Sequence, residues 1–182
     1  MSRRWMLPIG FLSFALFVVI LFNQMSAPVE GHAEHDGGEE HAVDLPESWP
    51  PFSRTALVRG KEAIGEIDRL HGKSIKVHDG YRADYASPQE QFTLWVATVG
   101  SAAEARHMLD QMVDRIGPNN KMFSKPELVT RRGTAKMYRS EGMGQSHFYY
   151  AKGAAVYWVA VSSPDPVKLA FRIAGEIGGE GP

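Results

Sequence analysis

Residues 91–116 read QFTLWVATVGSAAEARHMLDQMVDRI, and this stretch decides the fold. Residues 91–99 form a nearly continuous apolar and β-branched run, which is typical of a central strand buried on both faces. Ser101 and Glu104 then form a capping box, in which two side chains satisfy exposed backbone donors at a helix start. Apolar residues recur at helical spacing from Ala105 to Ile116. The stretch therefore predicts a central strand followed by a helix that lies on the sheet.

A similar pattern recurs later in the chain. Residues 94–97 read LWVA and residues 157–160 read YWVA. Each is preceded by an aromatic strand, within 81–85 and 148–150, and each is followed by a helical pattern. The recurrence indicates two hairpin-plus-helix halves that share one antiparallel sheet. The alternative is that central strands simply look alike.

The remaining elements follow from periodicity and turn residues. A helical stripe over residues 56–71 is followed by alternating strands at 75–77 and 81–85, joined by a turn at Asp79-Gly80. Residues 128–131 and 134–139 are expected to pair, as are 146–152 and 154–162. A last helix is expected to open at Ser163-Pro164, with proline at its first position. The predicted fold class is α+β, an antiparallel sheet flanked by helices.

This order of elements, over residues 55–178, is similar in outline to the Mog1/PsbP-like α/β/α sandwich. Members of that group are commonly accessory or binding proteins. The resemblance implies such a role here, and it carries over no individual functional residue.

The N-terminal residues predict a membrane anchor. Residues 5–22 contain no charge and span about 27 Å as a helix, close to the thickness of a bilayer core. Arg3 and Arg4 precede them, and acidic residues follow. The positive-inside rule then predicts an inner (cytoplasmic) membrane protein, anchored by residues 1–23, with a cytoplasmic N-terminus and a periplasmic or extracellular C-terminal domain. The alternative is a cleaved signal peptide, which also exports the domain.

Residues 24–51 predict a flexible acidic tether, and residues 52–182 a mildly basic domain. The tether has seven acidic residues up to Ser48 and no Lys or Arg. The remaining 18 basic and 14 acidic residues, with Arg3 and Arg4 set aside, give a charge of +4. This excess is too small to indicate nucleic-acid binding. His32, His35 and His41 lie among the tether's carboxylates and are candidate ligands for Cu or Zn. The alternative is a solvated linker with incidental histidines.

No cysteine is present, which excludes disulfides, thiolate metal sites and a lipobox anchor. The sequence contains no nucleophile elbow, P-loop or HExxH motif. Gly142 and Gly144 flank Met143, and an exposed loop there would offer Met143 and His147 to a ligand or a copper ion. The alternative is a tight glycine turn with the aromatic residues in the core.

Basic residues gather between the second helix and this loop, at Arg131, Arg132, Lys136 and Arg139, with Lys121 and Lys125 nearby. They predict either a docking patch for an acidic partner or lipid headgroups, or a strand edge that charge protects from aggregation. From these observations we expect a membrane-tethered, non-catalytic accessory or assembly protein with no required cofactor. The alternative is a periplasmic protein that captures or delivers Cu or Zn.

Overall fold

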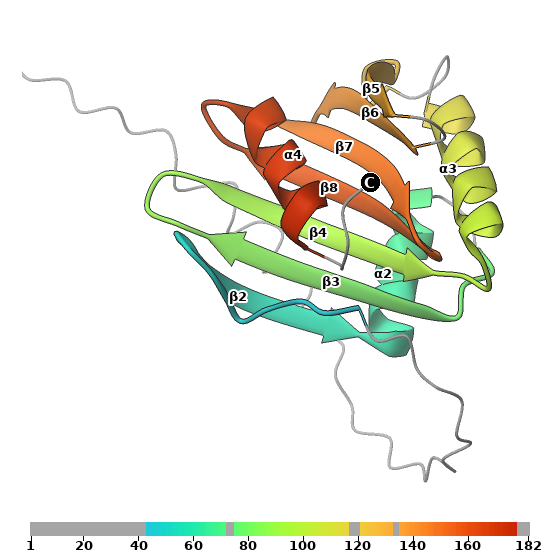
Figure 1. Ribbon diagram of the computed structural model, residues 1–182, viewed down its shortest axis with the longest axis horizontal. Coiled ribbons are helices and arrows are strands. Elements are labelled where there is room, and N and C mark those ends of the chain that lie inside the picture. Colours follow the sequence, from blue (N-terminus) through green and yellow to red (C-terminus); the bar gives the residue numbers. More distant parts are fainter. Residues whose placement is uncertain (1–42, 72–74, 117–120, 133–134, 178–182) are drawn as a thin grey trace, which may run out of the picture. The chain divides into compact units, whose positions relative to one another are not determined.

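The computed structural model describes residues 43–71, 75–116, 121–132 and 135–177 of the 182-residue chain. Eight strands form one antiparallel sheet in the order β1-β2-β3-β4-β8-β7-β6-β5 (Figure 1). Their bounds are β1 Ser48–Trp49, β2 Phe52–Arg59, β3 Asp79–Ala86, β4 Gln91–Thr98, β5 Glu127–Arg132, β6 Ala135–Gly142, β7 Gln145–Lys152 and β8 Ala155–Ser162. The predicted class, an antiparallel sheet with helices in an α+β fold, is confirmed.

Three helices cover the two faces of the sheet: α2 Gly60–His71, α3 Ala102–Ile116 and α4 Pro166–Glu176. Helix α4 crosses one face over β4 and β8, as Figure 1 shows, and buries Leu169 and Ile173 among the core aromatic residues. Helix α3 covers the opposite face, where Leu109 and Met112 pack against Trp158. Helix α2 lies on the same face as α3, because residues of both helices line one groove there.

Strands β4 and β8 pair at the centre of the sheet, and this register places Trp95 opposite Trp158. Three further strands lie on each side of this central pair, in mirrored chain order. The central position predicted for residues 91–99 is therefore confirmed. Ser101 also caps α3, since its Oγ accepts the Glu104 N–H at 3.1 Å. The Glu104 carboxylate reaches back to the Gly100 N–H at 2.8 Å, one residue before the expected donor.

The helix predicted over residues 56–71 is wrong in its first part. Residues 52–59 form β2, and α2 begins only at Gly60. Gly60 has φ 63°, a left-handed conformation that glycine adopts without steric cost. The chain turns from strand to helix there. Leu57 fitted the helical period of Ile64, Ile67 and Leu70 by coincidence, because it belongs to a strand.

Two further boundaries differ from prediction. Residues 75–77 form no strand, and Asp79 and Gly80 belong to β3 rather than to a turn. Thr98 holds them there, because its Oγ1 accepts the Asp79 N–H at 3.0 Å. The last helix begins at Pro166 instead of Pro164. Asp165 caps it by accepting the Lys168 N–H at 3.1 Å, so Pro166 occupies the first turn.

The packed domain begins before Phe52, the boundary expected from sequence. Leu45 and Trp49 are buried in the same core as Phe52. The Trp49 indole N–H donates to the Glu176 carboxylate at 2.5 Å, and the Arg172 guanidinium lies 4.2 Å from the Trp49 ring centroid. Leu45 and Trp49, from the segment assigned to the tether, therefore pack with the domain.

The predicted anchor, residues 1–23, lies outside the described residues. Among the helices of residues 43–177 that the structure describes, none has the length and apolar character needed to span a bilayer.

Candidate functional site

The β5 end of the sheet is the first candidate site. Strand β5 is the last in the sheet order, and a backbone bridge between Phe123 and Gly142 ties the preceding segment to the β6–β7 turn. Three apolar side chains are exposed in this region: Met122 at 58%, Leu128 at 51% and Met143 at 54%. An outer strand carries backbone groups that can pair with another chain, and exposed apolar residues add to that tendency.

The structure divides the predicted basic patch into two groups. Lys136 pairs with Asp110 of α3 at 2.9 Å, and this hydrogen bond raises the pKa of Lys136. Arg139 pairs with Glu141 at 2.6 Å. Both side chains therefore serve contacts within the domain. Arg131 and Arg132 lie on β5 itself, although the structure does not describe their side chains. Lys121 and Lys125, just before β5, are exposed.

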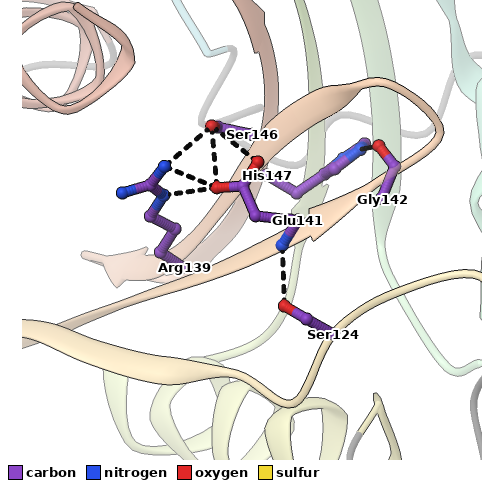
Figure 2. Close-up of polar contacts among 6 residues, drawn as sticks. All are labelled: Ser124, Arg139, Glu141, Gly142, Ser146 and His147. Carbon is purple, nitrogen blue, oxygen red and sulfur yellow. Dashed lines mark hydrogen bonds and ion pairs between the residues drawn. The ribbon is translucent and has the colours of Figure 1, made fainter.

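A polar cluster fixes the hairpin next to this edge (Figure 2). The Ser146 hydroxyl donates to Glu141 Oε1 at 2.9 Å and lies 3.3 Å from the Arg139 guanidinium, which donates to it. Ser124 and Glu141 exchange two bonds: the Glu141 N–H donates to Ser124 Oγ at 2.8 Å, and the Ser124 N–H donates to the Glu141 carbonyl at 2.7 Å. The cluster attaches the segment before β5 to β6.

His147 is buried, and both of its ring nitrogens are used inside the domain. Nδ1 accepts the Trp158 indole N–H at 3.0 Å, and Nε2 lies 3.0 Å from the Gly142 carbonyl, as Figure 2 shows for the latter pair. These partners require the neutral tautomer that carries its proton on Nε2. Burial lowers the pKa of His147, which also favours the neutral ring.

The expected exposed pair of Met143 and His147 is therefore not formed. Met143 lies at the turn with φ 52° and projects into solvent, whereas His147 is only 3% exposed. Strand alternation explains this, because the residues after the turn point alternately to the two faces of β7. His147 faces α3, where Phe123 packs edge-on against it at 4.8 Å. A metal ion at His147 would have to displace one of its two bonds.

The structure does not test the other predicted metal ligands. His32, His35 and His41 lie outside the described residues. Within the described ranges, no group of three or more His, Cys, Asp or Glu residues has metal-binding geometry. His107 contacts Gln111 at 2.8 Å, while its neighbour Asp110 pairs with Lys136. Ser146 and His147 are adjacent in sequence, yet Ser146 bonds Glu141 and the His147 ring bonds other groups.

A second candidate site, which sequence reasoning missed, is an apolar groove between α2 and α3. Helix α2 contributes Ile67 and Leu70, α3 contributes Met108 and Met112, and Trp95 and Trp158 line it from the sheet. Its enclosed space is about that of one water molecule, and the groove is partly open to solvent. The two tryptophans occupy matching places in the two LWVA-like segments, and this was the sequence signal that could have indicated the groove.

No protein-family model, no curated protein and no solved structure matches the chain. What this domain does must therefore be inferred from its own residues and their geometry.

Proposed function

We propose that this protein is a membrane-tethered, non-catalytic accessory or assembly protein, whose extracytoplasmic domain docks a partner at the β5 edge. The observation that carries the proposal is an outer strand with exposed Leu128, flanked by basic residues that include Lys121 and Lys125. The role agrees with the resemblance to the Mog1/PsbP-like sandwich, which remains a prediction. The anchor would hold the domain near its partner, and the acidic tether would give it reach.

The proposed partner is an extended, acidic protein segment. Strand addition to a sheet edge supplies main-chain hydrogen bonds, and side-chain contacts supply specificity. From Lys121 to Arg132 the chain has Lys121, Lys125, Arg131 and Arg132 against one acid, Glu127. These charges would favour an acidic segment and disfavour a basic one. A partner that inserts an apolar side chain next to Leu128 would also bury the exposed methyl groups of that residue.

Site-specific photo-crosslinking in native membranes tests this proposal. A photoreactive residue at position 128 is expected to capture a discrete partner, visible as one shifted band that mass spectrometry identifies. The matched control carries the same residue at position 171, because Phe171 is similarly exposed, at 41%, but lies on α4. Equal capture from positions 128 and 171, or capture from neither, would contradict docking at β5.

Charge reversal separates a specific edge from a merely sticky one. Arg131→Glu with Arg132→Glu should reduce the yield of the crosslink from position 128 severalfold. The yield that remains should depend less on salt concentration. The control is Arg106→Glu with Arg115→Glu, two exposed positions on α3. If the Arg131→Glu and Arg132→Glu double variant captures the partner as well as the wild type at low salt, the basic residues do not contribute to docking.

The proposed topology has its own test. Carbonate extraction of membranes should leave the full chain in the pellet if residues 1–23 are a retained anchor, and release it if they are cleaved. Protease added outside the cytoplasmic membrane should degrade the domain in either case. A domain protected from that protease would contradict export.

A further inference from the structure

Two exposed methionines lie together at the end of the β6–β7 hairpin. Met143 is in the hairpin turn and is 54% exposed, and Met122 is 58% exposed. The antiparallel bridge between Phe123 and Gly142 places residue 122 opposite residue 143, because each methionine adjoins one member of the bridged pair. We call residues 121–125 and 142–144 the methionine tip.

The backbone at Met143 is strained. Gly142 pairs with Gln145, so Met143 and Gly144 form a two-residue hairpin turn. Both residues have positive φ, 52° at Met143 and 77° at Gly144. Turns of this kind prefer asparagine, aspartate or glycine at the first position, because a bulky side chain is unfavourable there. Packing does not explain the methionine either, since more than half of its surface is exposed. A large apolar side chain held in solvent at a strained position favours a role in binding.

The rest of the domain holds the methionine tip in place. A Cβ atom on residue 142 would lie 2.3 Å from the Phe123 ring, so the two segments are in close contact. Phe123 in turn packs edge-on against Trp158 in the core, at 5.5 Å. The hydrogen bond from the Glu141 N–H to Ser124 Oγ joins the segments a second time (Figure 2). Because this backbone is already ordered, binding through the methionines costs little conformational entropy.

The charged residues of the methionine tip are Lys121 and Lys125, and both are exposed. The adjacent acid Glu141 pairs with Arg139 at 2.6 Å, so its charge is largely neutralised. Glu127, two residues beyond the tip, offsets one lysine. Apolar side chains between lysines match the surface of an anionic bilayer, where apolar groups enter the headgroup boundary and ammonium groups meet lipid phosphates.

We propose that the methionine tip inserts Met122 and Met143 into the headgroup region of an anionic membrane, where Lys121 and Lys125 bind the lipid headgroups. The inference rests on the proposed anchor in residues 1–23. A flexible chain as long as residues 24–42 has a root-mean-square end-to-end distance of about 25 Å, comparable with the diameter of a typical domain. Such a tether would keep the bilayer surface at a high effective concentration, so a contact made by a few side chains is enough.

Paramagnetic broadening in nanodiscs tests the proposal. The full chain, purified from membranes and labelled with ¹³C at its methionine methyl groups, is placed in nanodiscs of phosphatidylcholine and phosphatidylglycerol in equal amounts. A lipid with a nitroxide on its upper acyl chain broadens the signals of nearby methyl groups. The Met122 and Met143 signals, assigned by Met122→Leu and Met143→Leu, are expected to lose severalfold more intensity than that of buried Met112. The loss should be much smaller in phosphatidylcholine alone.

Matched variants make the result specific. Phe171→Met adds a methionine at a position of α4 that is also exposed, at 41%, and its signal should keep its intensity. Lys121→Glu with Lys125→Glu should reduce the broadening severalfold, whereas Arg106→Glu with Arg115→Glu, on α3, should not.

Met143→Asn separates membrane contact from folding. It gives the turn a residue that tolerates positive φ, so the domain should be at least as stable, yet the broadening of Met122 should fall.

Four results would overturn the proposal: tip signals that keep their intensity in anionic nanodiscs, equal broadening in Phe171→Met, broadening that survives the lysine reversal, or tip signals that change only when membrane proteins are added. The last result would assign the tip to a protein partner. A chain that co-elutes with nanodiscs without tip broadening refutes the tip contact alone. A chain that does not co-elute refutes the anchor and this inference with it, while capture from position 128 reports separately on docking at β5.

Discussion

Trp95 of β4 and Trp158 of β8 are direct partners at the centre of the sheet, with ring centroids 6.1 Å apart and planes inclined by 62°. Both contribute to the face that α3 covers, yet their indole N–H groups differ in hydrogen bonding. The Trp158 N–H has an acceptor in His147, whereas the Trp95 N–H has none among the described residues. The two halves of the sheet therefore differ at one pair of equivalent positions.

This difference predicts unequal costs for the same substitution. Trp158→Phe would leave buried His147 Nδ1 without its donor, a loss of about 1–3 kcal/mol beyond the change in ring size. Trp95→Phe makes a similar change in ring size but breaks no hydrogen bond. We expect Trp158→Phe to lower the free energy of unfolding more than Trp95→Phe, measured by urea denaturation of the full chain. Equal costs would mean that the His147 bond contributes nothing to stability.

The burial of the neutral His147 ring predicts that the folded domain loses stability in acid. The pKa of His147 is lowered in the folded protein from an ordinary value of 6.5, because burial disfavours the charged ring. The unfolded chain then binds more protons below pH 6.5, so stability falls as pH decreases from about 6.5 toward the lowered pKa. His147→Gln keeps a neutral acceptor and donor and should remove this component. Unfolding measured between pH 7.5 and 5 tests it, with His107→Gln, an exposed histidine, as the control.

Regular strands and amphipathic helices of this fold were predictable from the sequence. Residues 91–116 and the hairpin of 145–162 carry their own periodicity, and the structure has strands and a helix there. Residues 56–59 were wrongly predicted as helix, because a short apolar run fits both the helical and the strand period. The chain turns into the helix at Gly60, whose φ is positive. Trp49 fell within the range 24–51 assigned to the tether, although it was expected to dock onto the domain, and its packing partners Arg172 and Glu176 lie far away in sequence.

The candidate sites were less predictable than the fold. The basic residues near the β5 edge were visible in the sequence, but the partners of Lys136 and Arg139 were not, since Asp110 belongs to another element and Glu141 is paired by strand geometry. His147 looked available because glycines precede it. Its burial follows from which face of β7 it occupies, a consequence of register that local sequence does not reveal. The groove forms only where residues of α2, α3, β4 and β8 meet, which no single segment encodes.

Lys152 makes a contact at the end of α4 that we expect to stabilise the fold. Its ammonium donates to the carbonyls of Ala174, at 3.0 Å, and of Ile177, at 3.4 Å. These carbonyls belong to the helix C-terminus, where backbone acceptors lack partners within the helix. Lys152→Met should therefore lower the free energy of unfolding by about 1–3 kcal/mol. Lys168→Met, at an exposed position on α4, should change it by less than about 0.5 kcal/mol. A Lys152 variant as stable as the Lys168 variant would count against the contact.

The alternative function predicts that metal binding depends on the tether. Deletion of residues 30–42 removes His32, His35 and His41. If the protein captures Cu or Zn through them, isothermal titration of the full chain should lose its binding heat on deletion, while crosslinking from position 128 stays unchanged. His78→Ala with His107→Ala, two exposed histidines of the domain, is the control. Binding that survives the deletion would exclude the tether as the metal site. Copper that perturbs the His147 resonances would instead revive that ring as a ligand.

Trp49 gives the most direct test of where the domain begins. Its ring is buried, stacks on Phe52 at 5.4 Å and lies beneath the Arg172 guanidinium. Trp49→Ala should cost about 3–5 kcal/mol, typical of a buried aromatic residue, and should expose residues 43–51 to limited proteolysis. Trp49→Phe keeps the aromatic contact but loses the bond to Glu176, so a smaller cost is expected. Phe171→Ala, on the exposed side of α4, should cost little. If Trp49→Ala left stability and proteolysis unchanged, residues 43–51 would belong functionally to the tether and the domain would begin at β2.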